Sequence, residues 1–344
     1  MLWNKDGNGT AELKTYIGFL YASNNFNNIA TDINLAEEEI KEIIGTPVYN
    51  LAHDHYYSDN YNSEDSGSGS ASGSGSGSGS GASNDLLDEL IGRIRLPVAL
   101  LAYKSFSENA DLSHEDTGRK IKIDPENEKP AFEWMLERDD AATLRKANKN
   151  IDRLIAFLEE HEDSISEWKN SEAQQTARSL FINTAKQFNE YYPIDNSRMF
   201  YIKILPFIKE AERVSVKPVI TPDLFDEIKN EIKSDNLSTT NTDILEYIRY
   251  ALSLQSMFIA VKRLAIEVLP ESLVRDYINR LNMSREVLSR ARVKKEIADH
   301  LEIEAKKRLS DLQELLTKND EGSGYDPEIT DFDTNDEDNL YYRT

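Results

Sequence analysis

The sequence predicts a mainly α-helical protein made of two tandem helical units, with one short β-hairpin. A ladder of apolar residues with helical spacing occurs in both halves of the chain, 158 residues apart. The same offset holds in a later segment, so whole units correspond and not only single helices. The ladder pairs are Leu86/Ile244, Leu87/Leu245, Leu90/Ile248, Ile94/Leu252 and Leu96/Leu254, followed by Ala147/Ala305, Ile151/Leu309, Leu154/Leu312 and Leu158/Leu316.

The first predicted unit spans residues 1–163. A helical pattern, strongest over 35–44, ends at Gly45, because glycine accepts a left-handed backbone and the nearby Pro47 cannot continue the helix. A polar stretch then leads into the Ser/Gly loop 66–83, which we expect to be a flexible coil spanning about 25 Å. Three further elements complete the unit: a helix over 86–106 with a kink or break at Pro97, a β element over 113–123 with its turn at Gly118, and a helix over 141–161.

The second predicted unit spans residues 164–318, and residues 319–344 form an acidic tail that we expect to be disordered. Gly45 to Val48 resembles Val216 to Val219 at an offset of 171, which makes a loop of the first unit 13 residues longer than its counterpart. The helices predicted here begin with one capped by Asn196 or Ser197 and interrupted by Pro206. The others cover 222–233, 243–269, 271–282 and 284–318.

Composition excludes several classes of protein. The formal net charge is −22 and there is no cysteine, so phosphate backbones are repelled and disulfides, thiolate metal sites and cysteine nucleophiles are excluded. The start of the chain lacks the apolar core of a signal peptide, and the longest apolar run, about 96–103, is far shorter than a membrane span. We therefore expect a soluble protein.

No pattern in the chain predicts catalysis. The run His53-Asp54-His55 could begin a metal site, but no third ligand is recognisable, and a solvated loop is the favoured interpretation. The run Asp331 to Asn335 resembles a calcium loop, but Asp336 stands at the glycine position and Tyr342 at that of the bidentate glutamate. We expect no catalytic, cofactor-binding or metal-binding residues.

Aromatic residues supply the interface candidates. Trp134 is assigned to the core because Phe132 and Leu136 surround it, whereas Trp168 lies in a polar stretch and is a candidate for partner contact. The acidic tail adds Phe332, Tyr341 and Tyr342 as candidates for a docking arm, although a purely solubilising tail fits its composition equally well.

Several short apolar motifs resemble a known family. They are Phe181-Ile182-Asn183-Thr184-Ala185 with Phe188, Asn196-Ser197 with Phe200, Leu205-Pro206-Phe207-Ile208 with Ala211, and Lys217-Pro218-Val219. The chain resembles uncharacterised proteins of Bacteroidetes phages and prophages found among head-morphogenesis genes. These are similar to the head–tail connector (adaptor) proteins of tailed phages. The likeness covers most of 164–318 and, more weakly, 16–161, where residues 16–26 echo 181–188.

The resemblance implies a structural virion protein at the portal–tail junction. Such a subunit forms a ring, twelvefold in the family, that contacts the portal and tail proteins, and DNA passes through its lumen without sequence-specific binding. It is present in the virion and, during assembly, in the host cytoplasm. The alternatives are a non-viral cytoplasmic helical-repeat adaptor and, third, an enzyme of unrecognised class.

Overall fold

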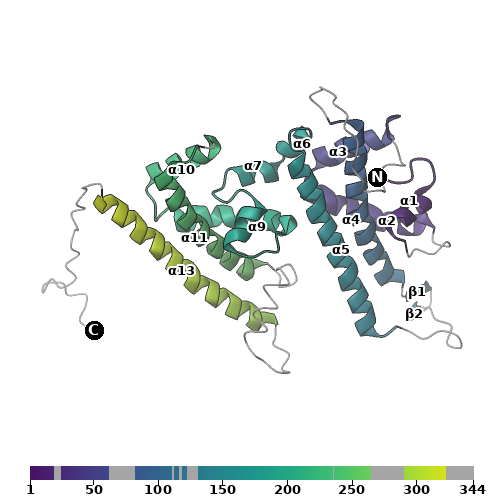
Figure 1. Cartoon of the computed structure of the whole chain (residues 1–344). Helices are drawn as coiled ribbons and strands as arrows, with labels where there is room; N and C mark the ends of the chain where they lie inside the picture. Colours follow the sequence, from purple (N-terminus) through teal and green to yellow (C-terminus); the bar gives the residue numbers. More distant parts are fainter. Residues whose placement is uncertain are drawn as a thin grey trace.

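The computed structural model describes residues 1–18, 25–61, 82–110, 112–115, 118–121, 131–234, 236–264 and 290–322. Within these residues the chain is mainly helical, and the helices form two bundles, each around its own core (Figure 1). The first bundle contains α1 (Gly9–Tyr16), α2 (Phe26–Ile44), α3 (Thr46–Tyr57), α4 (Asn84–Ala110), α5 (Glu133–Glu160) and α6 (Ser166–Lys169). The second contains α7 (Glu172–Arg178), α8 (Ala185–Tyr191), α9 (Arg198–Ala211), a π-helix (Glu212–Val216), α10 (Pro222–Ser234), α11 (Thr239–Arg263) and α13 (Arg290–Gly322).

Gly45 ends α2 as the sequence predicts, with a φ of 88° that favours glycine. The prediction that His53 to His55 lie in a solvated loop is wrong. Pro47 lies in the first turn of α3, where its missing N–H costs nothing, and the helix continues to Tyr57. His53 and His55 are therefore helical.

Two internal prolines do not interrupt their helices. Pro97 lies inside α4 and Pro206 inside α9, so the predicted interruption at Pro206 is wrong, and of the predicted kink or break at Pro97 the break is wrong. Val98, Ala99 and Ala102 directly after Pro97 are all completely buried, so tertiary packing outweighs the lost backbone hydrogen bond. Of the two predicted caps for α9, Ser197 is the one that accepts the N–H of Phe200.

The buried positions of α11 and α13 fall 154 residues after those of α4 and α5. This spacing holds over both pairs of helices, and it differs from the predicted 158 by about one helical turn. The matched buried pairs are Leu87/Asn241, Leu90/Ile244, Ile94/Ile248, Val98/Leu252, Thr143/Ile297, Ala147/Leu301, Ile151/Ala305 and Leu158/Leu312.

A second spacing relates α2 to α9. Buried residues of α9 lie 175 positions after buried residues of α2. Beyond Glu212 this offset is 176, so the π-helix accommodates one additional residue. The matched pairs are Ile29/Ile204, Ile33/Ile208, Ala36/Ala211 and Glu37/Glu212, then Ile40/Val216 and Ile44/Ile220. The predicted offset of 171 is therefore wrong. The connection from α3 to α4 has 26 residues and that from α10 to α11 has four, a difference of 22 and not 13.

Two predicted boundaries also shift. Ile165 and Trp168 pack into the first core, so α6 belongs to the first bundle and not to a unit that begins at 164. At the other end, α13 continues to Gly322, four residues into the predicted tail. The remaining tail, the predicted helix over 271–282 and most of the Ser/Gly loop lie outside the described residues.

Strands β1 (Leu112–Glu115) and β2 (Gly118–Ile121) lie between α4 and α5 and pair antiparallel, with Leu112 opposite Ile121. Among the described helices, α11 alone is long and apolar enough to cross a membrane, but 67% of that stretch is buried inside the protein. This burial is typical of a central core helix.

Candidate interaction surface

In each bundle a buried glutamate and an arginine hydrogen-bond the backbone N–H and carbonyl of the same residue, and we call this arrangement the node. In the first bundle the N–H of Leu2 donates to Glu37, at 2.7 Å, and the Nε of Arg95 donates to the carbonyl of Leu2, at 2.6 Å. The Arg95 guanidinium also lies over the rings of Trp3 and Tyr56, at 4.9 and 4.6 Å from their centroids. The node thus fixes the N-terminal residues against α2 and α4.

The second bundle contains the same arrangement. The N–H of Phe181 donates to Glu212, and the Nε of Arg249 donates to the carbonyl of Phe181, at 2.9 Å. Lys229 adds an ion pair to Glu212, with Nζ and Oε2 2.7 Å apart. Burial raises the pKa of Glu212 and lowers that of Lys229. The counterpart of Phe181 is therefore Leu2. The weaker sequence echo predicts Tyr16 instead, and that prediction is wrong.

The two bundles are joined by polar contacts between α5 and the first turn of α9. Asp152 accepts the N–H of Met199, at 2.9 Å, and the hydroxyl of Ser197, at 3.2 Å. Glu159 accepts the Nε of Arg198, at 2.6 Å. Carboxylates at a helix N-terminus satisfy free N–H groups and complement the helix dipole. Burial raises the pKa of Asp152, although these hydrogen bonds act in the opposite direction.

The first half of α5 exposes its outer face. Trp134, Arg138, Arg145 and Lys149 are separated by four, seven and four residues, so they lie on one side of the helix. The buried positions of α5, such as Ala147 and Ile151, lie on the opposite side. Trp134 is 56% exposed, and the neighbouring Met135 is 43% exposed. This outer face of α5 therefore combines cations with large apolar side chains.

The two tryptophan assignments from the sequence are reversed. Trp168 is completely buried in the first core, so it offers no surface to a partner, and the prediction of an interface role is wrong. Trp134, expected in the core, is exposed together with Phe132 and Leu136. The interface candidates Phe332, Tyr341 and Tyr342 lie outside the described residues.

The missed surface did leave a signal in the sequence. The cations at 138, 145 and 149 are in helical register with Trp134, and a helix stripe of charged residues is typical of a solvent-exposed face. At helical spacing Phe132 and Leu136, four residues apart, lie on one side, whereas Trp134, two residues from each, points to the opposite side, so their closeness in sequence does not indicate a shared core.

His55 has a structural role. Its Nε2 lies 2.8 Å from Asp88 Oδ1, and both side chains are buried, so the pair ties α3 to α4. His53 lies one turn from Tyr49 and Tyr57 and contacts both rings. Among the described residues, no group of three or more His, Cys, Asp or Glu side chains is placed to hold a metal ion.

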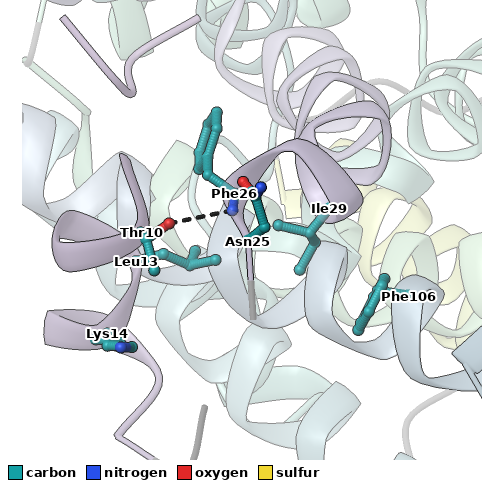
Figure 2. Close-up of a pocket in the computed structure, with 7 residues that line it drawn as sticks. All are labelled: Thr10, Leu13, Lys14, Asn25, Phe26, Ile29 and Phe106. Atoms are coloured by element: carbon teal, nitrogen blue, oxygen red, sulfur yellow. Dashed lines mark hydrogen bonds between the residues drawn. The ribbon is translucent and has the colours of Figure 1, made fainter. Parts of the chain in front are cut away.

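A small apolar crevice opens beside α1, the start of α2 and the end of α4 (Figure 2). Its cavity volume is about 10 Å³, which is room for about one water molecule. Phe26 forms one wall, and its N–H donates to Thr10 Oγ1 at 3.1 Å. The crevice is lined by Thr10, Leu13, Lys14, Asn25, Phe26, Ile29 and Phe106. The lining is apolar, with a single cation and no cluster of acid–base groups, so it offers contact to an apolar group at its mouth.

These features define a mainly helical protein of two bundles with an exposed cationic and aromatic helix face. The chain belongs to a family of unknown function, DUF6712, whose sequence profile matches residues 40–178 and 216–331. Both bundles contribute to this match, since its first stretch runs from the end of α2 through α6 to α7 of the second bundle and its second stretch runs from the last residue of the π-helix through α13. No curated protein and no solved structure matches the chain.

Proposed function

We propose that this protein is a non-catalytic structural subunit that assembles into a ring at the portal–tail junction of a tailed phage. In this proposal the chain consists of two tandem connector-like units joined through α5 and α9. The observation that carries the proposal is the repeated node, in which Leu2, Glu37 and Arg95 correspond to Phe181, Glu212 and Arg249. The motif resemblance over residues 181–219 supplies the link to connector proteins.

A duplicated helical unit suits an assembly protein on physical grounds. Each bundle buries its own core, and the contact between α5 and α9 combines hydrogen bonds with the packing of Met199 and Ile202 on the first core, so the chain presents two helical bodies with separate lateral surfaces. A net charge of −22 would let DNA pass through a lumen without binding to its wall. Assembly would take place in the host cytoplasm and the product would remain in the virion.

Native mass spectrometry of the chain, alone and with a portal protein, tests the proposal. We expect a closed ring, twelvefold if it follows the connector family, and a stable complex with the portal. A chain that remains monomeric and ignores the portal would refute it. A cryo-EM map of the assembled particle with a neutral or basic lumen would refute the passage of DNA along an acidic wall.

One observation favours the alternative, a cytoplasmic helical-repeat adaptor. The small crevice beside Phe26 and Phe106 presents an apolar lining that a partner's apolar side chain would contact at its mouth. Substituting Phe106 by Asp would introduce a charge into that crevice. If this substitution abolished partner capture while ring formation was never observed, the adaptor function would replace the ring.

A further inference from the structure

We infer that the outer face of α5 binds the acidic, aromatic C-terminal segment 325–342 of a second copy of this chain. The inference rests on the proposed function in one respect, because it names the contact between neighbouring subunits. Its two partners are defined by their chemistry: a helix face with cations beside exposed aromatic and thioether groups, and a segment with carboxylates beside aromatic rings.

The cations on this face have no ion-pair partner among the described residues. Arg138, Arg145 and Lys149 are exposed, and in the part of the chain that the structure describes none of them forms an ion pair. Some other cations do pair, since Arg93, Lys104 and Arg263 each contact a glutamate, and what sets the α5 cations apart is that they follow one helix face beside Trp134. A cluster of free cations on a protein of net charge −22 is a local site for an anionic partner.

The apolar side chains on the same face narrow the choice of partner. Trp134 and Met135 expose a large apolar surface at one end of the face. Aromatic rings pack well on tryptophan and on thioether sulfur, and tryptophan and arginine are the side chains enriched in binding hot spots. A partner that offers only phosphate groups would leave these two side chains uncovered.

Segment 325–342 has the matching composition. It contains seven carboxylates, at 326, 328, 331, 333, 336, 337 and 338, and four aromatic residues, Tyr325, Phe332, Tyr341 and Tyr342. The face from Trp134 to Lys149 is about 22 Å long, because a helix rises 1.5 Å per residue. About seven extended residues cover that length. Residues 331–338 would therefore place Phe332 near Trp134 and five carboxylates along the cations.

The position of the last described helix favours a second copy over the same chain. The C-terminal end of α13 lies on the far side of the second bundle from the first half of α5 (Figure 1). Contact within one chain would require the segment to cross the whole molecule. Contact between neighbours satisfies the same charges without that constraint, and every subunit would both donate and receive a segment.

The test uses full-length variants and measures self-association by sedimentation equilibrium. Arg138→Glu/Arg145→Glu/Lys149→Glu should weaken association at least about tenfold, since three attractive pairs become repulsive. The control Lys186→Glu/Lys203→Glu/Lys209→Glu changes the net charge equally at exposed positions of the second bundle and should leave association unchanged. Circular dichroism and thermal unfolding would verify that both triple variants fold.

A charge swap identifies the partner segment. Adding Asp333→Lys/Asp336→Lys/Asp338→Lys to the α5 triple variant should restore association, because the signs are exchanged on both sides. Failure of this rescue, or equal weakening by the control triple variant, would overturn the inference. Trp134 provides a direct signal, because Trp3 and Trp168 are buried and only Trp134 emission should shift to shorter wavelength on association.

The remaining outcomes separate the two proposals. If a DNA duplex shifts Trp134 emission and association does not, the face binds nucleic acid and the inference is wrong. If rings form and bind the portal equally well in the α5 triple variant, the inference fails while the ring function stands. If the charge swap restores association but no ring or portal complex forms, the contact is supported and the ring function fails.

Discussion

Arg95 and Arg249 occupy the same position in the two bundles. Each donates its Nε to a backbone carbonyl of its own bundle, that of Leu2 at 2.6 Å and that of Phe181 at 2.9 Å. Their surroundings differ, because Arg95 is only 2% exposed and is enclosed by aromatic rings, whereas Arg249 is half-buried. The same hydrogen bond should therefore contribute unequally to the stability of the two bundles.

We expect Arg95→Met to lower the free energy of unfolding by about 3 kcal/mol, because Glu12 and the carbonyl of Leu2 lose their buried partner. Arg249→Met should cost about 1 kcal/mol, since water can reach the freed carbonyl. Urea unfolding followed by circular dichroism measures both. Arg95→Lys is the control, and it should not restore stability, because a lysine ammonium cannot make the separate Nε and Nη contacts. Equal losses at both sites would contradict this account.

The pair Glu212 and Lys229 should be coupled. Glu212→Gln leaves the buried ammonium of Lys229 without its carboxylate, and we expect a loss of about 3 kcal/mol. Glu212→Gln/Lys229→Met should regain most of this loss, because the unpaired charge is removed and the glutamine can still accept the N–H of Phe181. A double-mutant cycle by chemical denaturation measures the coupling energy. Additive effects of the two substitutions would show that the pair contributes nothing specific.

The helical character of both bundles could be predicted from periodicity, but the register between them could not. An apolar stripe on a helix repeats about every 3.6 residues, so sliding one ladder past another by four residues keeps apolar residues aligned. Leu86 therefore matches Ile244 in the sequence, although the buried counterpart of Ile244 is Leu90. The arginines settle the register, because Arg95 and Arg249 make the same backbone contact.

The outer face of α5 was missed for a different reason. Trp134 has apolar neighbours in sequence, but the first turns of α5 extend past the core, and all the residues from 131 to 139 are exposed. How far a helix projects beyond its bundle depends on tertiary packing, so the apolar neighbours of Trp134 in sequence do not show whether it is buried. The same limit explains Trp168, whose short helix has polar neighbours yet closes the first core.

Asp152, in the contact between α5 and α9, makes the free energy of unfolding depend on pH. Its pKa is raised in the folded state by burial, so the folded protein binds this proton more readily than the unfolded chain does. The stability from this group is thus fully present below the unfolded pKa and is lost as the pH rises through the higher folded pKa. Relative to Asp152→Asn, the wild-type protein should gain unfolding free energy as the pH falls through that window.

Urea unfolding of the wild-type protein and Asp152→Asn over pH 3.5 to 7 would measure this difference. Asparagine can still accept the N–H of Met199, so the variant should be about as stable as the wild type at pH 7. Asp152→Ala leaves that N–H without an acceptor and should cost about 1–2 kcal/mol at every pH. A difference between wild type and Asp152→Asn that does not change with pH would refute a raised pKa.

Gly9 is required by a close approach at the start of α1. A Cβ atom added there would lie 2.7 Å from the Phe26 ring and 2.9 Å from Asn4 Cβ, closer than real contacts allow. Alanine has the higher helix propensity by about 1 kcal/mol, but we expect the clash to dominate and Gly9→Ala to lower stability by about 1–2 kcal/mol. Gly18→Ala is the matched control, since nothing lies within 4 Å of an added Cβ there. Thermal unfolding measures both variants.

Because Phe26 also forms a wall of the crevice in Figure 2, Gly9→Ala/Phe26→Leu should relieve the clash and recover part of the loss. A Gly9→Ala variant more stable than wild type would show that the ring of Phe26 moves freely at this site.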